Sequence, residues 1–395
     1  MTLYLGLFVT LFSFATLISQ TDSNNNRINS FLDFIPSNNS AIGIVEGERY
    51  KDTISSEWHH SNQIKIWSLT DGELISSIAL NQSEYIEGFN VSHDGKGFVL
   101  QSKIRMFSKT DIFGKKEIAE IKYFSFEEKK WLWKKNWELD THCMRLTFSE
   151  DNSQIICITN KNVLFIDTKT GIEIKKSEQL GSFLNEGDTE YSRRALSKYG
   201  NYFVFWYNYI YTSDWDDNSF VLSPLNPLTW PFRLIGAFVN LFDGPKYLYI
   251  WDVLNDNLKE KIEIPKGLPI GSPAFSTMGD TLYWGPIKND YKLKIYDVVN
   301  SILIKESTDS LVFDFGEYKT ISPDQKYLFE TYRIVEVQTG KIIKKFDFKP
   351  NSLRFGSTYP AAFSSDKKYF ITEEKGKICL YSTKGWEKIW EVPTE

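Results

Sequence analysis

The sequence has few of the residues from which proteins build metal sites and disulfide frameworks. Its 395 residues include three cysteines and four histidines. Cys143, Cys157 and Cys379 are odd in number and have no common spacing, which predicts neither a disulfide framework nor a zinc site, and we expect them to be small apolar strand residues. His59 and His60 are adjacent and lack the i, i+4 spacing of a zinc-binding helix, so we place them in a solvated loop. No metal or cofactor is expected.

Motifs of catalytic chemistry are also missing. The chain has no Gly-x-Ser-x-Gly nucleophile elbow, no phosphate-binding glycine loop and no Cys-x-x-Cys pair. Without a nucleophile and base at a recognisable spacing, no catalytic residue can be assigned. We therefore expect a protein that is not an enzyme.

Neither sign of charge is in excess. The 46 basic and 51 acidic residues give a net charge of -5, so the chain has no overall field that attracts a phosphate backbone. The basic and aromatic stretch from Lys129 to Trp137 fits a groove that stacks single-stranded bases, but it also fits an outer strand whose lysines face water and protect an edge. We favour the outer strand and expect no nucleic-acid partner.

What the sequence does have is a strand pattern that returns six times. Each copy is an apolar run that ends in serine, followed by a polar turn and two more short strands. The serines are Ser92, Ser149, Ser197, Ser276, Ser322 and Ser364. The turn after the third strand, such as Thr70-Asp71-Gly72, carries residues that suit the positive backbone angles of tight hairpins. Seven such third strands can be counted, which indicates seven units of four strands.

A four-stranded unit that repeats in this way cannot bury both of its faces alone, so neighbouring units must stack around an axis. The pattern resembles the WD40 family of β-propellers over residues 39–392, and Trp251-Asp252 keeps the Trp-Asp dipeptide of that family. The resemblance implies an all-β fold, a single propeller of seven four-stranded antiparallel blades, with six or eight as alternatives. We expect the first two strands of blade one near residues 41–45 and 49–55. Residues 389–392 fit a fourth strand of the last blade, so the ring needs no shared strand to close.

The N-terminal segment, residues 1–19, is almost wholly apolar and precedes an Asn-rich linker at residues 20–38. The apolar run is short for a membrane-spanning helix and has the length of the central region of a secretory signal. Three interpretations remain open: a cleaved export signal, an uncleaved membrane anchor, and a segment buried in a cytoplasmic protein.

Three glycosylation sequons follow the N-terminal segment. They are Asn38-Asn39-Ser40, Asn81-Gln82-Ser83 and Asn90-Val91-Ser92. They matter only if the chain takes a eukaryotic secretory route. Asn90 falls in an expected strand, where a glycan is hard to place.

A long insertion, residues 207–246, separates the second and third strands of the fourth blade. Its residues 228–244 have helix signals at both ends and a mostly apolar surface. The apolar side chains we assign to a partner-binding or lipid-binding surface are Trp230, Phe232, Leu234, Phe238 and Phe242. Strand direction places this loop on the face where the chain enters each first strand, together with the N-terminal segment and a longer excursion at 107–120. The alternative is a helix folded onto the propeller.

The resemblance implies a rigid interaction platform, and function depends on the site that the platform carries. We expect an exported or membrane-associated scaffold that binds a protein partner through the face with the long loops, with contact to a membrane surface as a further expectation. One alternative is an exported propeller enzyme or small-ligand binder, whose central channel would need carboxylates or histidines converging from several blades. The other is a cytosolic scaffold.

Overall fold

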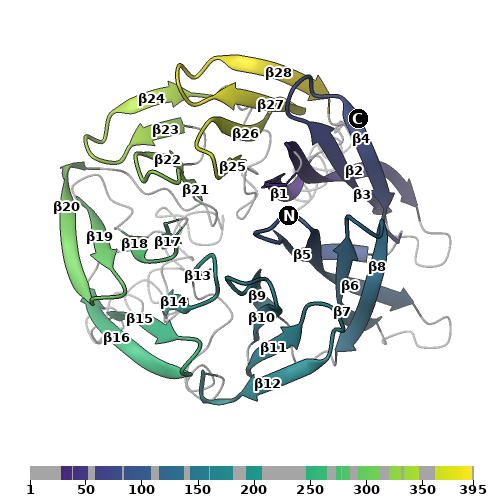
Figure 1. Ribbon diagram of the computed structural model, residues 1–395, viewed down its shortest axis with the longest axis horizontal. Coiled ribbons are helices and arrows are strands. Elements are labelled where there is room, and N and C mark those ends of the chain that lie inside the picture. The colour runs from purple at the N-terminus through teal and green to yellow at the C-terminus, as the bar shows by residue number, and fades with distance from the viewer. Residues whose placement is uncertain are drawn as a thin grey trace, which may run out of the picture.

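The computed structural model describes residues 28–37, 39–51, 58–81, 84–107, 115–137, 143–159, 161–180, 193–206, 246–264, 273–276, 278–284, 292–310, 320–330, 333–346 and 361–393. These residues form seven four-stranded antiparallel sheets arranged as a closed ring (Figure 1). Every sheet is built from four consecutive strands. The fold is therefore an all-β propeller with seven blades, as the repeat predicted.

The strands follow one another in chain order, four to a blade. Blade 1 has β1 (Ile28–Ile35), β2 (Ser40–Lys51), β3 (Trp58–Ser68) and β4 (Leu74–Ala79), and blade 2 has β5 (Glu84–Val91), β6 (Gly97–Phe107), β7 (Lys115–Ser125) and β8 (Lys130–Trp137). Blade 3 has β9 (Cys143–Phe148), β10 (Gln154–Thr159), β11 (Val163–Asp167) and β12 (Glu173–Ser177), and blade 4 has β13 (Arg193–Leu196), β14 (Tyr202–Trp206), β15 (Lys246–Asp252) and β16 (Asn257–Ile264). Blade 5 has β17 (Ala274–Phe275), β18 (Thr281–Trp284), β19 (Lys292–Asp297) and β20 (Ile302–Ser310), and blade 6 has β21 (Thr320–Ile321), β22 (Tyr327–Glu330), β23 (Arg333–Glu336) and β24 (Ile342–Lys345). Blade 7 has β25 (Ala361–Phe363), β26 (Tyr369–Glu374), β27 (Lys377–Ser382) and β28 (Lys388–Pro393).

The first strand of each blade lies nearest the axis and the fourth lies on the outside (Figure 1). Each first strand contacts the first strand of the next blade, and the contact of β25 with β1 completes the ring. Aromatic and branched side chains fill the space between neighbouring blades. Between blades 3 and 4, for example, Ile156 and Phe165 pack with Phe203 and Phe205. Burial of both sheet faces between blades is the main source of stability in this architecture.

The repeated serine closes the turn between the first and second strands. The Ser197 hydroxyl accepts a hydrogen bond of 2.9 Å from the backbone N–H of Tyr202. The same bond, from a backbone N–H five residues later, is made to Ser92, Ser149, Ser276, Ser322 and Ser364 at 2.9 to 3.2 Å. A side-chain acceptor for a turn N–H is the usual reason why serine is selected at such a position.

A left-handed residue occurs in every turn on one side of the ring. Each first-to-second turn and each third-to-fourth turn contains one residue with positive φ. In chain order they are Asn39, Gly72, Gly95, Lys129, Asn152, Gly171, Gly200, Asp256, Gly279, Ser301, Gln325, Gly340, Lys367 and Trp386. Tight hairpins need this backbone conformation to match the twist of their strands. We call this side of the ring the turn face, and the opposite side the loop face.

The first blade differs from its expected position. Strand β1 spans Ile28–Ile35, inside the range expected to be a linker, and β2 spans Ser40–Lys51. The propeller therefore begins before residue 39. His59 and His60 lie on β3, paired with Tyr50 and Arg49, and not in a loop.

The excursion expected at residues 107–120 lies partly outside the described residues, which leave out 108–114, and its described ends are strand. Strands β6 and β7 extend to Phe107 and from Lys115, and their backbones pair along the whole length. The fourth strand expected at residues 389–392 is confirmed as β28, and no strand is shared between blade 7 and blade 1.

Candidate functional site

The two faces of the ring differ in the length of their connections. On the turn face, the first-to-second and third-to-fourth turns are short and hydrogen-bonded through their backbones. The connections on the loop face join second to third strands and fourth to first strands. There, residues 207–245 separate Trp206 at the end of β14 from Lys246 at the start of β15. Residues 207–245 thus connect the second and third strands of blade 4 along the chain, and they lie outside the described residues.

The five apolar residues assigned to the insertion surface lie outside the described residues. They are Trp230, Phe232, Leu234, Phe238 and Phe242. The N-terminal segment 1–19 also lies outside the described part of the chain. Within that part, no helix has the length and apolar character needed to cross a membrane.

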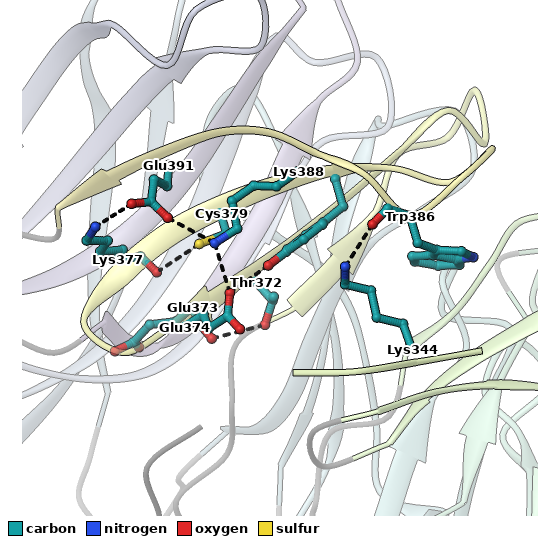
Figure 2. A network of polar contacts seen from close by, with 10 residues as sticks. Lys344, Thr372, Glu373, Glu374, Lys377, Cys379, Trp386, Lys388 and Glu391 are labelled. Atoms are coloured by element: carbon teal, nitrogen blue, oxygen red, sulfur yellow. Dashed lines mark hydrogen bonds and ion pairs between the residues drawn. The ribbon is translucent and has the colours of Figure 1, made fainter. Parts of the chain in front are cut away.

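A network of paired charges lies in blade 7, on β26, β27 and β28 near the turn that joins β26 to β27 (Figure 2). This turn is on the loop face. Lys388 Nζ lies 3.1 Å from Glu374 Oε2 and 2.9 Å from Glu391 Oε2. Glu391 also pairs with Lys377. The Tyr381 hydroxyl donates a hydrogen bond of 2.6 Å to Glu374 Oε2. The two carboxylates are therefore joined through a lysine and do not face each other across an open space.

The proton affinities in this network argue against acid–base chemistry. Burial, followed by the hydrogen bond to Glu374, raises the pKa of Tyr381. Burial opposes the charge of Lys388, but its hydrogen bonds to Glu391 and Glu374 outweigh burial and raise its pKa. Burial also raises the pKa of the neighbouring free thiol of Cys379 to about 11. Near neutral pH these groups stay protonated, so they supply neither a nucleophile nor a general base.

A second cluster of charges is buried in blade 2, on the side next to blade 1. Lys122 forms an ion pair with Glu84, lies 3.5 Å from Glu120 Oε1 and sits 4.6 Å from the ring centre of Trp131. Both Lys122 and Glu84 are only 2% exposed. Asn62 Nδ2 adds a hydrogen bond of 2.9 Å to the Glu84 carbonyl oxygen. Removing one charged member would leave a buried charge unpaired, so these charges hold β5 and β7 in one arrangement within blade 2, and the Asn62 bond links them to blade 1.

A third group of polar residues connects blades on the turn face. The His93 backbone N–H donates to Asn152 Oδ1 at 2.7 Å, and Nε2 lies 3.2 Å from the Phe148 carbonyl oxygen. The Tyr199 ring packs against the imidazole with a centroid distance of 4.8 Å. Burial lowers the pKa of His93, with the hydrogen bond to Phe148 opposing it and the Lys198 charge reinforcing it. His93 therefore acts as a neutral bridge between blades 2 and 3.

These clusters were not anticipated from the sequence, because each joins residues from different strands or blades. Among the described residues, no group of three or more His, Cys, Asp or Glu side chains could hold a metal ion. The basic and aromatic stretch is the outer strand β8, with Lys129, Lys130 and Lys134 exposed and Trp131 and Trp133 half-buried against the protein.

The cysteines correct one expectation. Cys379 is a free, buried thiol in β27, as expected. Cys157, which is completely buried in β10, is disulfide-bonded. Strand β10 pairs with β9, where Cys143 lies. Spacing along the chain could not reveal the bond, because strand pairing determines which thiols come within reach.

The class of protein is defined by the ring itself: a seven-bladed β-propeller of WD40-like shape. The solved β-propeller domain of Cps50 (Swd1) from Myceliophteria thermophila is similar, with a TM-score of 0.51 and 10% sequence identity over 91% of this chain and 99% of that domain. In all, 1128 chains of solved structures match, so the likeness establishes the fold and does not single out an activity. No family model matches the sequence. No curated protein matches it either.

Proposed function

We propose that the protein is a non-enzymatic interaction scaffold, exported or held at a membrane, that binds a protein partner through its loop face. The observation that carries the proposal is the contrast between the two faces. The turn face is made of short hydrogen-bonded turns, whereas the loop face carries residues 207–245 between Trp206 and Lys246. Binding residues concentrate on long loops positioned by a rigid scaffold.

The resemblance to WD40 propellers supports a scaffold, because propellers of this shape commonly present a face to other proteins. The chemistry of the described residues supports the same interpretation. In the blade 7 network Lys388 pairs with Glu374 and Glu391, and the pKa values of Cys379, Tyr381 and Lys388 are raised, so these three groups keep their protons near neutral pH. In such a protein, Trp230, Phe232, Leu234, Phe238 and Phe242 form the apolar binding surface, against a partner or against lipid.

Two features support export. Residues 1–19 have the composition of a secretory signal or an N-terminal anchor. The disulfide at Cys157 is the second, because disulfides persist in oxidising compartments and are rare in the cytosol.

Substitution on each face tests the scaffold proposal. Trp230→Asp and Phe238→Asp should abolish partner crosslinking and membrane association in the native host while circular dichroism stays unchanged. The matched control is Ile172→Asp, an apolar residue that is 66% exposed near the turn face, which should leave both associations intact. Unchanged association in the folded loop variants would show that the insertion is not the binding surface.

The intact mass of the protein from soluble and membrane fractions tests its location. Loss of about 15 to 20 N-terminal residues is the result expected for a cleaved signal. A full-length chain in the membrane fraction corresponds to an anchor. A full-length chain in the cytosolic fraction would contradict the export part of the proposal.

A further inference from the structure

One motif of the sequence has no role in the scaffold. Asn81-Gln82-Ser83 is an acceptor sequon for an N-linked glycan, one of three in the chain. Asn81 lies between β4 and β5, in the connection that crosses from blade 1 to blade 2 on the loop face. Its side chain is exposed. Asn81 is therefore placed at the rim of the ring, where a large polar group can extend into solvent.

The backbone at Asn81 is held in a turn while its side chain is left available. The Asn81 N–H donates to Glu84 Oε2 at 3.2 Å, and its carbonyl accepts from the Glu84 N–H at 3.1 Å. Within the described residues, the Asn81 amide group itself forms no hydrogen bond. Modification of the amide nitrogen therefore breaks no hydrogen bond to the part of blades 1 and 2 that the structure describes.

The sequon at Asn90 has different surroundings from the sequon at Asn81 and serves as an internal control. Asn90 is half-buried on the inner strand β5, paired with Val99. The hydroxyl-bearing residue of this sequon, Ser92, is only 2% exposed, and its Oγ accepts a hydrogen bond of 3.0 Å from the Gly97 N–H. A glycan at Asn90 would have to fit among the packed inner strands. The folded ring therefore accommodates a glycan at Asn81 and excludes one at Asn90.

We propose that Asn81 carries an N-linked glycan in the mature protein, an inference that rests on the export part of the proposed function. The donor is an oligosaccharide attached through its anomeric carbon to a lipid pyrophosphate. Asn81 Nδ2 forms a bond to that carbon, the bond between the carbon and the pyrophosphate oxygen breaks, and the amide loses one proton to the transferase. The lipid pyrophosphate is the leaving group, and no oxidant or reductant takes part.

The position of this glycan has a consequence for the partner. Asn81 precedes β5 at the boundary of blades 1 and 2, whereas β14 and β15 of blade 4 lie across the ring (Figure 1). A glycan at the first position shields that sector of the loop face. Strands β14 and β15, which residues 207–245 connect along the chain, belong to a blade away from that sector, so the glycan need not cover the proposed binding surface.

The full chain is expressed in eukaryotic secretory cells, once with its own residues 1–19 and once with a heterologous signal peptide in their place. Peptide mapping after amidase-type deglycosylation should show Asn81 converted to Asp and Asn90 unchanged. Ser83→Ala should abolish the modification, and Ser83→Thr, which preserves the sequon, should retain it. Neither variant changes Asn81 or Glu84, whose hydrogen bonds hold the turn.

Comparing the chain with its own residues 1–19 and the chain with the heterologous signal separates the two proposals. An unmodified Asn81 in chains routed by the heterologous signal overturns the glycan proposal, whatever residues 1–19 do. A modified Asn81 with the heterologous signal only supports the glycan proposal and contradicts the export proposal. Modification of Asn81 in both forms of the chain supports both proposals. Peptide mapping measures the modification of Asn81 both in protein that stays inside the cells and in protein that is secreted. Poor secretion therefore does not affect the result.

Discussion

The indole Nε1 of Trp390 donates a hydrogen bond of 3.0 Å to the carbonyl oxygen of Leu69, 321 residues away in the sequence. Trp390 lies on β28, the last strand, and Leu69 lies in the third-to-fourth turn of blade 1. The same core cluster contains Leu32 and Trp67 of blade 1 and Leu380 of blade 7. Side-chain packing and this bond therefore close the ring in place of a shared strand.

The same arrangement occurs between blades 2 and 3. Trp133 Nε1 on β8 donates a hydrogen bond of 2.8 Å to the Thr168 carbonyl oxygen, which has the position of Leu69 in its turn. In both turns a glycine with positive φ faces the indole: Gly72 faces Trp390 and Gly171 faces Trp133. An outer-strand tryptophan thus locks a blade onto the turn of the next.

We expect Trp390→Phe to lower the free energy of unfolding by about 1–2 kcal/mol, because the ring is retained while the Leu69 carbonyl loses its partner. Trp390→Ala should cost about 3–5 kcal/mol, since it also leaves a cavity in the seam. Urea denaturation followed by circular dichroism measures both. The control is Ile389→Ser, because Ile389 is 43% exposed on the same strand and should change stability by less than about 0.5 kcal/mol. Wild-type stability of Trp390→Phe would show that the hydrogen bond is not needed to close the ring.

A pair of glycine substitutions separates backbone strain from steric clash. Gly171 and Gly376 have φ values of +69° and +76°. A Cβ on Gly171 would lie 2.6 Å from Trp133, whereas a Cβ on Gly376 would meet no atom within 4 Å. Gly376→Ala should therefore cost only the strain of a left-handed alanine, about 1–2 kcal/mol. Gly171→Ala should cost clearly more, because the indole must also move.

Melting temperatures of the two alanine variants, measured side by side, make this comparison. Both substitutions reduce the freedom of the unfolded chain by the same amount, so their difference reports the folded state. Equal decreases in melting temperature would mean that the Trp133 indole can move away from a Cβ at residue 171 without an energetic cost. The contact between Trp133 and Gly171 would then contribute less to stability than its short distance indicates.

The sequence predicted the blades well because the signal is local. In six blades, the hydroxyl of Ser197 or its counterpart accepts a hydrogen bond from the backbone N–H five residues later. One short sequence pattern therefore marks this turn in each of the six blades. Blade 1 lacks that signal. Its first turn runs directly from Ile35 to Ser40, whose backbones pair, without the serine bond. The sequence pattern therefore predicts a linker where the structure has strand Ile28–Ile35.

The polar clusters could not be predicted, because their members meet only through strand register and blade stacking. Cys379 faces Glu391 across β27 and β28 only after a bulge shifts the pairing. Lys122 and Glu84 come from two strands that do not pair with each other. A sequence pattern locates strands, but it does not state which charged side chain will lie opposite another.

The pH dependence of stability should reflect Asp33 on β1. The Asp33 carboxyl group is packed closely by other protein atoms, but part of the residue's surface is exposed to solvent. Burial raises its pKa from 3.8 to about 6, against the opposing effects of the Phe34 N–H and the Lys198 charge. The folded state therefore holds this proton more tightly than the unfolded chain does. The resulting stabilisation is fully present below about pH 4 and is lost as the pH rises through about 6.

Asp33→Asn keeps a neutral side chain at every pH and can still accept the Phe34 N–H bond of 2.8 Å. Relative to this variant, the wild type should lose stability between pH 4 and 7, by at most about 2–3 kcal/mol. Asp151→Asn is the control of opposite sign, because hydrogen bonds from Ser149 and Ser153 lower the Asp151 pKa. That carboxylate stabilises the fold above its unfolded pKa and loses the effect as the pH falls. Between pH 4 and 7 the urea midpoints of wild type and Asp33→Asn should therefore change relative to each other, whereas the difference between wild type and Asp151→Asn should stay constant and change only below about pH 4. A flat difference for Asp33→Asn would mean that the folded protein does not favour the protonated acid.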